Sequence, residues 1–304
     1  MNRYGIIGKP LGHSYSERYF TELFAREGID AQYRPYPIDQ IEEVRELMKQ
    51  LDGFNVTYPY KETILPYLNE IDSIAQEIGA VNVVCHGKGY NTDWIGFRDS
   101  LAPLVHSGEK ALLLGTGGVS KAIQYALKEM GVKWTVVSRQ QSCSLEDASL
   151  QVRGERLEVR GERLEVRGER LEVRGERLEV RGEGTPQSLC DSSPINKGAE
   201  RGDEAMRRLG YEEVDEQVMR EHRIIVNCTP LGMHPYENEY PNIPYENLSK
   251  EHLLYDCIYN PERTLFLQKG EKMGCQVKNG LEMLHRQADE AWGVFRDKRL
   301  EVRG

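Results

Sequence analysis

The sequence contains no hydrophobic run that approaches the roughly 18 residues needed for a membrane-spanning helix. Its first stretch, MNRYGIIGKPLGHS, is interrupted at Gly8, Lys9 and Pro10, so it lacks the apolar segment of a secretion signal. We therefore expect a soluble, unprocessed chain that works in the cytoplasm.

Positive charge and paired cysteines are also scarce. The 304 residues carry 40 Lys and Arg against 49 Asp and Glu, a net charge of -9, which predicts small-molecule partners rather than nucleic acid. The six cysteines form no CxxC pair and no spacing typical of a metal site, which indicates reduced thiols and no bound metal. They are Cys85, Cys143, Cys190, Cys228, Cys257 and Cys275.

Residues 154–184, GERLEVRGERLEVRGERLEVRGERLEVRGEG, repeat one seven-residue unit four times. A coiled coil needs apolar residues three and four positions apart, whereas Leu157 and Val159 are two apart and would lie on opposite sides of a helix. On a strand, the odd period moves the next pair, Leu164 and Val166, to the other face. With two apolar residues per unit, burial is not expected to offset the entropy of ordering, so we predict a disordered, solvated insertion.

The chain ends in a further copy of this unit, RLEVRG, at 299–304. We interpret both copies as traces of one repetitive genetic element, the first inside a low-complexity insertion at 141–200. Without about 50 inserted residues, roughly 250 remain, which fits two domains of ordinary size.

Outside the insertion, β-rich runs alternate with amphipathic helical stretches, the pattern of α/β folds with mostly parallel sheets. We expect one α/β domain at 1–98, a second at 99–279, and a final helix at 280–296 that packs back on the first domain. The expected strands are 3–8, 32–38, 53–57, 81–87, 110–114, 134–139, 223–229, 253–259 and 275–279. The expected helices are 16–28, 40–50, 59–68, 118–131, 203–222, 264–274 and 281–295.

The stretch LLLGTGGVSKA places Gly115, Gly117 and Gly118 at a turn between a strand and a helix. Glycines at such a turn let backbone N–H groups and the positive helix end approach a pyrophosphate. The match to G-x-G-x-x-G is incomplete, because Ser120 stands at the third glycine, and an ordinary βα turn is the alternative interpretation.

The next strand ends in Ser138 and Arg139, about 20 residues past the glycines, where NAD-binding folds commonly have an acidic residue against the ribose. A guanidinium suits a 2′-phosphate, because its planar donors match the phosphate oxygens and its charge offsets theirs. This indicates NADP rather than NAD, and an exposed arginine without a ligand is the alternative.

Two charged residues are candidates for catalysis. In GFNVTYPYKE, Asn55 and Thr57 fall on one strand face, and Lys61 falls in the first turn of a helix that we expect Pro59 to open. A lysine there opposes the helix macrodipole, which favours a functional role over that of a surface lysine. Asp93 precedes another helix, either as its N-cap or as the group that holds Lys61 in place as a proton donor.

The stretch GHSYSE has two interpretations. Ser14 and Glu17 match a capping box at a helix start. Alternatively, the hydroxyls of Ser14 and Ser16 bind a carboxylate without adding charge. From these residues alone we favour the cap.

Taken together, these motifs resemble shikimate dehydrogenase, the NADPH enzyme of aromatic biosynthesis. GHSYS, GFNVTYPYKE, GAVNVV, NTDWIGF, GTGGVSKA, NCTPLGM, YDCIYNP and NGLEMLHRQ occur in the order and approximate spacing of that family, over residues 3–140 and 222–296. The resemblance implies an N-terminal α/β substrate domain, a Rossmann-like NADP-binding domain, and reversible NADPH-dependent reduction of 3-dehydroshikimate to shikimate on the route to chorismate and the aromatic amino acids.

The resemblance also implies roles for single residues. Lys61 and Asp93 correspond to the catalytic positions. The substrate-binding positions are Ser14, Ser16, Asn55, Thr57, Asn82, Tyr259 and Gln287, so a substrate role replaces our preference for Ser14 as a cap alone. The cofactor-binding positions are Gly115, Gly117, Gly118, Val119, Ser138, Arg139, Cys257 and Gly280.

The sequence departs from the family in three places. Ser138, Arg139 and Gln140 replace Asn-Arg-Thr, which alters part of the 2′-phosphate site. Trp94 stands where the family often has glycine, so we expect it to crowd the loop beside Asp93. The insertion directly follows the cofactor strand, and a solvated insertion should be tolerated there.

Two alternatives remain from the sequence. One is a paralogue that oxidises quinate or accepts NAD. The other is a non-catalytic NADP-binding protein that uses the repeat as an interaction arm, against which Lys61 and Asp93 argue. Deletion of 150–184 tests the second alternative, because unchanged activity and oligomer size would mean that the repeat is not an assembly element. We expect a monomer or a homodimer.

Overall fold

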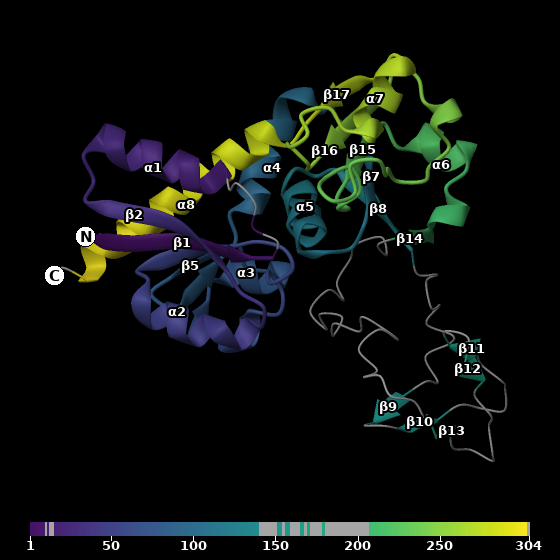
Figure 1. The fold of residues 1–304 in the computed structure, drawn as a ribbon. Helices are drawn as coiled ribbons and strands as arrows, with labels where there is room; N and C mark the ends of the chain where they lie inside the picture. The colour runs from purple at the N-terminus through teal and green to yellow at the C-terminus, as the bar shows by residue number, and fades with distance from the viewer. Residues whose placement is uncertain are drawn as a thin grey trace. The chain divides into compact units, whose positions relative to one another are not determined.

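The computed structural model describes residues 1–9, 11, 15–139 and 207–302, with side chains through Arg296, and five short strands within 140–206. Residues 140–206 form a unit of their own. The rest of the chain contains two six-stranded sheets flanked by helices (Figure 1). The predicted α/β class is therefore confirmed. None of the described helices is long and apolar enough to cross a membrane.

The first sheet is mixed, with the strand order β2-β1-β3-β5-β6-β4. β1 is parallel to β2 and β3, β5 is antiparallel to β3 and β6, and β4 is parallel to β6. The strands are β1 (Asn2–Gly8), β2 (Ala31–Pro37), β3 (Gly53–Val56), β4 (Glu70–Ile71), β5 (Val83–Cys85) and β6 (Lys88–Tyr90).

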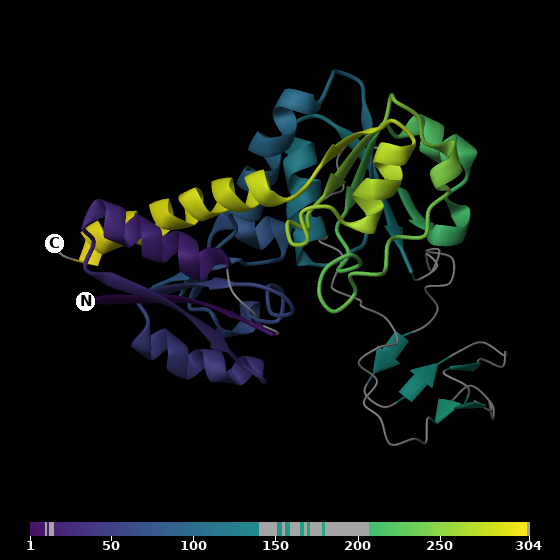
Figure 2. The same ribbon diagram turned by 45° about the horizontal axis from the view of Figure 1, so that its top comes forward.

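Helices cover both faces of this sheet (Figure 2). One face packs against α1 (Tyr15–Glu27) and α8 (Leu281–Val302), and aromatic rings fill the space between them. The Tyr4 ring of β1 lies 4.9 Å from that of Phe295 and 6.1 Å from that of Trp292, between ring centroids. The other face packs against α2 (Val44–Gln50) and α3 (Ser73–Ile78). The last helix of the chain thus helps to close the core of the first sheet.

The second sheet is entirely parallel, with the order β14-β8-β7-β15-β16-β17. Counted along the chain from β7, this is 3-2-1-4-5-6, the doubly wound order of dinucleotide-binding folds, and the order reverses between β7 and β15. The strands are β7 (Lys110–Leu114), β8 (Lys133–Ser138), β14 (Arg207–Gly210), β15 (Ile224–Asn227), β16 (Leu253–Asp256) and β17 (Gln276–Lys278).

This sheet also has helices on both faces. α4 (Asp93–Leu101) and α5 (Gly118–Glu129) cover one face, and α6 (Glu216–Glu221) and α7 (Leu265–Lys272) cover the other. α4 packs closely on α8, because a Cβ added at Gly96 would lie 2.6 Å from the Met283 carbonyl oxygen. The short 3-10 helices are η1 (Ile41–Glu43), η2 (Leu65–Tyr67), η3 (Ala102–Leu104), η5 (Tyr211–Glu213) and η6 (Tyr245–Asn247).

The helix predicted at 59–68 is wrong. This segment forms turns and the 3-10 helix η2. Pro66 lies inside it, and a proline has no N–H to donate and clashes with the preceding helical turn. The Ile64 N–H still bonds to the Tyr60 carbonyl at 3.1 Å, but Leu65 already bonds three residues back, to Glu62. Lys61 therefore lies in a turn, and the argument from a helix macrodipole does not apply to it.

Of the polar helix predicted at 203–222, only the last part is confirmed, as α6, and the prediction is wrong for 207–215. Residues 207–210 form the edge strand β14, because Leu209 is buried and the strand pairs with β8 from Thr135 to Ser138. The helix begins only after Asp215, whose carboxylate accepts a hydrogen bond from the Val218 N–H. The sequence analysis missed α3, β4 and β6, and the predicted boundary at 98–99 falls inside α4.

Within 140–206 the structure describes strands of two or three residues. β13, β10 and β9 form one antiparallel sheet, and β11 pairs with β12. They are β9 (Gln151–Arg153), β10 (Arg156–Glu158), β11 (Glu165–Val166), β12 (Glu169–Arg170) and β13 (Leu178–Glu179). Most of the predicted insertion at 141–200 and of the repeat at 154–184 lies outside the described residues, so its lack of order stays a prediction.

Candidate active site

An ion pair between Lys61 and Asp93 lies at the centre of the candidate site. Lys61 Nζ is 2.7 Å from Asp93 Oδ2, and the side chains are only 18% and 6% exposed. Asp93 is the first residue of α4, where the positive helix end stabilises a carboxylate. The structure therefore joins the two charged residues that the sequence singled out. The interpretation of Asp93 as an N-cap is wrong, because Thr92 holds that position and the Asp93 carboxylate binds Lys61.

Asn82 organises this pair from the strand side. Its Nδ2 donates to Asp93 Oδ1 at 3.0 Å and lies 3.2 Å from Gln287 Oε1 of α8. Its Oδ1 accepts from the Thr92 N–H at 2.7 Å. Two candidate residues 205 positions apart in the chain thus meet through one amide. Because its hydrogen bonds go to Thr92, Asp93 and Gln287, Asn82 holds the surrounding groups in fixed orientations.

Asn55 and Thr57 lie at the end of β3. Asn55 is buried, and its Oδ1 accepts a 2.7 Å hydrogen bond from the Tyr33 hydroxyl of β2. Its Nδ2 lies 3.4 Å from the Asn82 carbonyl oxygen. Thr57 follows β3 directly and is partly exposed. Tyr33 was not predicted as a site residue, because a strand pattern does not tell which neighbouring strand a tyrosine hydroxyl reaches.

A cluster of aromatic side chains surrounds Tyr15, which precedes the buried Ser16 in the first turn of α1. The Tyr15 ring stacks on His285 of α8, with centroids 5.2 Å apart, and its hydroxyl hydrogen bonds to His285 Nε2. The same ring meets Tyr259 edge to face at 6.0 Å. Burial raises the pKa of Tyr259, which keeps its phenol neutral. Ser14 lies outside the described residues, so its predicted role stays a prediction.

The glycine turn lies where the order of the second sheet reverses. Gly115 follows β7 with a φ of 109°, in the left-handed region that favours glycine. Its added Cβ would lie 3.0 Å from Thr229 Cγ2, just beyond β15. Gly117 caps α5, and among the described residues other than its chain neighbours no heavy atom lies within 4 Å of its added Cβ, so there is room for a ligand to approach the backbone. These features fit a pyrophosphate at the α5 N-terminus.

Lys61 lies beside this helix start. The Cβ added at Gly118, the first residue of α5, would lie 3.1 Å from Lys61 Cβ. Val119 follows it and is partly buried. The structure thus places the ion pair next to the turn that suits a dinucleotide.

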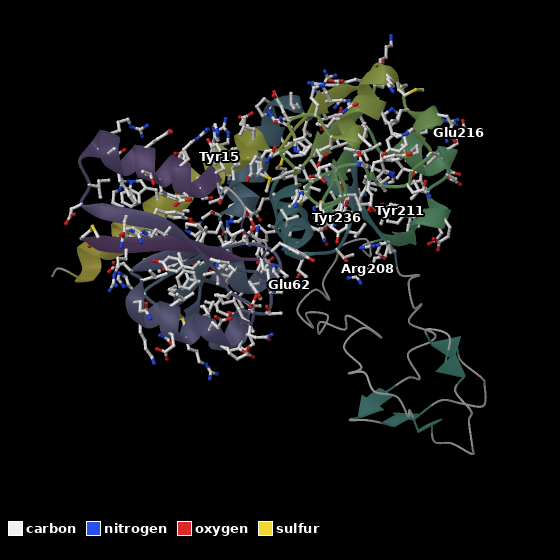
Figure 3. All side chains as sticks on the ribbon, in the orientation of Figure 1. Tyr15, Glu62, Arg208, Tyr211, Glu216 and Tyr236 are labelled. Atoms are coloured by element: carbon white, nitrogen blue, oxygen red, sulfur yellow. The ribbon has the colours of Figure 1, made fainter. Side chains whose placement is uncertain are left out.

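Ser138 and Arg139 lie at the carboxyl end of β8. Ser138 is the last strand residue and pairs with Gly210, and Arg139 after it is exposed. Burial raises the pKa of the neighbouring Tyr211 to about 12, and the positive charge of Arg139 opposes that rise. Tyr211 and Arg208 are labelled in Figure 3 at this end of the sheet. Gln140 is not among the described residues.

Cys257 follows β16 directly and so lies at the carboxyl end of the second sheet. Cys257 is partly exposed, and the pKa of its thiol is raised by a hydrogen bond with Cys228 and by burial. Gly280 lies against it, because an added Cβ would be 2.2 Å from the Cys257 carbonyl oxygen. Only glycine fits this close approach.

The buried Asp256 carboxylate fixes the loop that follows β16. Asp256, at the end of β16, is fully buried and accepts hydrogen bonds from Asn227 Nδ2 at 3.1 Å, the Ile258 N–H at 3.0 Å and the Thr264 hydroxyl. Burial raises its pKa to about 7, although these hydrogen bonds oppose the rise. Asp256 thus links the ends of β15 and β16 to the start of α7.

Trp94 does not crowd Asp93 as expected from the sequence. Its ring is buried and meets Tyr125 of α5 edge to face, with centroids 5.1 Å apart. The Arg98 guanidinium lies over the ring, 4.9 Å from its centroid. The indole therefore packs between α4 and α5, because successive residues of a helix point in different directions.

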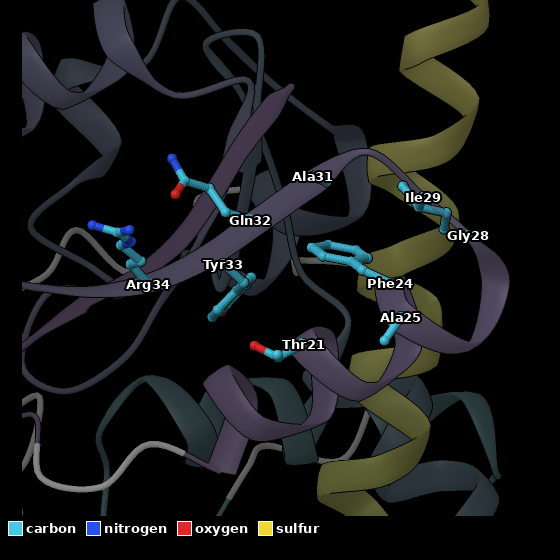
Figure 4. A pocket seen from close by; sticks show the side chains of 9 residues that line it. All are labelled: Thr21, Phe24, Ala25, Gly28, Ile29, Ala31, Gln32, Tyr33 and Arg34. Carbon is cyan, nitrogen blue, oxygen red and sulfur yellow. The ribbon is translucent and has the colours of Figure 1, made fainter.

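A separate hollow of about 440 Å³ lies between α1 and β2 (Figure 4). Thr21, Phe24, Tyr33 and Arg34 are among the residues that line it. Its lining includes none of the predicted site residues, although the Tyr33 hydroxyl bonds to Asn55. We therefore do not assign the reaction to this hollow.

The known proteins to which this chain is similar are shikimate dehydrogenases. Residues 6–84 match the family model of the shikimate dehydrogenase substrate binding domain. The chain is 32% identical over 291 residues to the shikimate dehydrogenase (NADP(+)) of Carboxydothermus hydrogenoformans, which covers 92% of this chain and 86% of the relative. It is similar to the crystal structure of shikimate dehydrogenase from Aquifex aeolicus, with 29% identity and a TM-score of 0.68 over 97% of this chain and 92% of that one.

The chain is also similar to a second solved structure, which was determined with ligands bound. The shikimate 5-dehydrogenase of Thermus thermophilus, solved in complex with NADP(H) and shikimate, shares 25% identity with this chain. The TM-score is 0.69, over 97% of this chain and 93% of the other.

Proposed function

Since the chain belongs to the shikimate dehydrogenase family, we propose that it catalyses the reversible, NADP-dependent reduction of 3-dehydroshikimate to shikimate. The observation that carries the proposal is the buried Lys61–Asp93 pair beside the start of α5. The reaction serves the biosynthesis of chorismate and the aromatic amino acids. Residues 1–98, with helix 280–296, would bind the substrate, and 99–279 would bind NADP.

The ring of the substrate would be held by neutral groups. Asn55, Thr57, Asn82 and Gln287 offer amides and a hydroxyl, which suit an uncharged polyol because they form directional hydrogen bonds without adding charge. The carboxylate would lie against Ser16 and Tyr259, together with Ser14. Asn82 hydrogen bonds to both Asp93 and Gln287, so this part of the site is preorganised.

The dinucleotide would lie along the edge where the second sheet reverses. NADPH, when bound there, supplies a hydride to the ketone carbon. Gly117 leaves room at the helix start, where Gly115 and Gly118 would also contact the cofactor, and the Arg139 guanidinium suits the 2′-phosphate. The remaining cofactor contacts would come from Val119, Ser138, Cys257 and Gly280.

Lys61 would donate a proton to the ketone oxygen and take it back in the reverse direction. Negative charge grows on that oxygen as the carbon is reduced, and a positioned ammonium neutralises it. Asp93 holds Lys61 Nζ at 2.7 Å and so fixes the direction of the proton. General acid catalysis of this kind contributes about 10² to 10⁴ in rate.

Cys228, Cys257 and Cys275 are free thiols, which suits the reducing cytoplasm where we place the protein. We propose that it acts there as a monomer or a homodimer on small-molecule substrates.

The test follows NADPH formation with shikimate, beside quinate and beside NAD as the alternative partners. The wild type should prefer shikimate and NADP, and Lys61→Ala should lower kcat by roughly 10² to 10⁴ while shikimate still binds by calorimetry. Lys128→Ala is the matched control, because it removes an exposed lysine from an ion pair with Glu77. Preference for quinate or NAD would support the paralogue instead. If NADP binds but nothing turns over, the proposed function is wrong.

A further inference from the structure

We propose that Tyr33 is a positioning residue whose hydroxyl orients the Asn55 amide so that its N–H faces the ring hydroxyls of the substrate. The inference rests on the proposed function, since it assigns Asn55 to the binding of the ring. Nothing in the motifs of the sequence singles out Tyr33, which lies on the edge strand β2.

The Tyr33 hydroxyl is held firmly in the core. Its side chain is 3% exposed, and its ring stacks on Phe20 of α1 with centroids 4.5 Å apart and an interplanar angle of 15°. Tyr33 and Asn55 lie on the two strands that flank β1, opposite Tyr4 and Ile6 respectively. The hydroxyl therefore reaches across β1 to donate to Asn55 Oδ1 at 2.7 Å.

This hydrogen bond fixes the orientation of the Asn55 amide, with Oδ1 toward Tyr33 and Nδ2 away from it. Oδ1 accepts from Tyr33, so Nδ2 faces the Asn82 carbonyl oxygen at 3.4 Å. A flipped amide would place Oδ1 against that carbonyl oxygen, and two acceptors without a proton between them repel. The Tyr33 hydroxyl and the Asn82 carbonyl therefore favour the same orientation.

The orientation leaves a donor for the substrate. The contact of Asn55 Nδ2 with the Asn82 carbonyl is long and weak, because its 3.4 Å exceeds the usual N–H···O distance, whereas the Val56 N–H donates to the same carbonyl at 2.8 Å. Nδ2 carries two protons, and in the described part of the chain it makes no other hydrogen bond. The second proton is thus available for a ring oxygen.

Burial supports the donor role of Tyr33. It raises the pKa of the phenol well above its ordinary value, and the negative charge of Glu17 adds to the rise, whereas a hydrogen bond from Ser16 opposes it. Tyr33 therefore keeps its proton throughout the neutral range. Without that hydroxyl, Asn55 Oδ1 would be buried without its partner, and the amide would lose its fixed orientation.

The test is Tyr33→Phe, which keeps the ring on Phe20 and removes only the hydroxyl. KM for shikimate and its calorimetric Kd should rise about five- to tenfold, the loss expected for one net hydrogen bond. kcat should stay within about twofold and KM for NADP should not change, because Asn55 binds substrate and transition state alike. Tyr255→Phe is the matched control. It also removes a buried hydroxyl, which is bonded to Ser100, but none of the proposed substrate-binding residues contacts that hydroxyl.

A double variant separates positioning from packing. In the Asn55→Ala background, Tyr33→Phe should have no further effect on KM, because the group that it orients is gone. The inference is overturned if Tyr33→Phe leaves KM and Kd unchanged, if it raises KM as much in the Asn55→Ala background, or if Tyr255→Phe raises KM equally. If the wild type neither binds nor turns over shikimate, the proposed function fails and the inference falls with it.

Discussion

Replacing Asp256 by Asn should remove a loss of stability that the wild type suffers as the pH rises. The carboxyl group is fully buried at the end of β16, with donors around it and its pKa raised to about 7 by burial. An Asn fits the same contacts, because Oδ1 can still accept from Asn227 and Ile258, while the Thr264 hydroxyl can turn to accept from the new Nδ2.

The magnitude follows from the difference in proton affinity between the folded and unfolded chains. The folded protein holds this proton up to about pH 7, whereas the unfolded chain loses it near 3.8. The stabilising contribution is therefore complete below the unfolded pKa and is lost as the pH rises through the folded one. Between pH 5 and pH 8 the linkage relation gives a loss of about 2.5 kcal/mol from this group alone.

Urea unfolding at pH 5, 6, 7 and 8 would measure the effect as the difference in unfolding free energy between the wild type and Asp256→Asn. That difference should move by about 2.5 kcal/mol in favour of the variant across this range. Asp215→Asn makes the same chemical change at the exposed cap of α6 and is the matched control across the same pH series. Parallel profiles for the wild type and Asp256→Asn, or a shift toward the wild type, would refute the reasoning.

Two further predictions concern the same edge of the sheet. In thermal unfolding, Gly280→Ala should destabilise the fold by roughly 3 kcal/mol, because its Cβ would press on the Cys257 backbone. Gly293→Ala in α8 is the control: its Cβ would contact none of the described residues outside its own helix, so it should stabilise by up to about 1 kcal/mol. Alkylation of Cys257 by iodoacetamide, followed by mass spectrometry, should be slow at neutral pH and still accelerating above pH 9, because its pKa is raised from 9.0. A rate that levels off below pH 9 would contradict that shift.

Much of the fold could be predicted because its signals are local. The buried run at 110–114 followed by glycines predicts a strand and a turn into a helix, and β7 and α5 lie there. The predictions were wrong where a local pattern was compatible with two kinds of secondary structure. The polar stretch at 203–222 looked like one helix, but parallel pairing with β8 draws 207–210 into the sheet. The segment before Pro66 was too short for a helix, so the environment of Lys61 was described wrongly.

The sequence by itself determined the class of fold and the residue types of the site, because hydrophobic period, glycine turns and the order of motifs are written along the chain. The tertiary structure alone decided which of those residues meet. Asp93 reaches Lys61 across 32 positions, and Gln287 reaches Asn82 across 205. Tyr33 reaches Asn55 because β1 lies between their strands. Such distances depend on strand order and on helix packing, and those are set by burial of the whole core rather than by any local pattern.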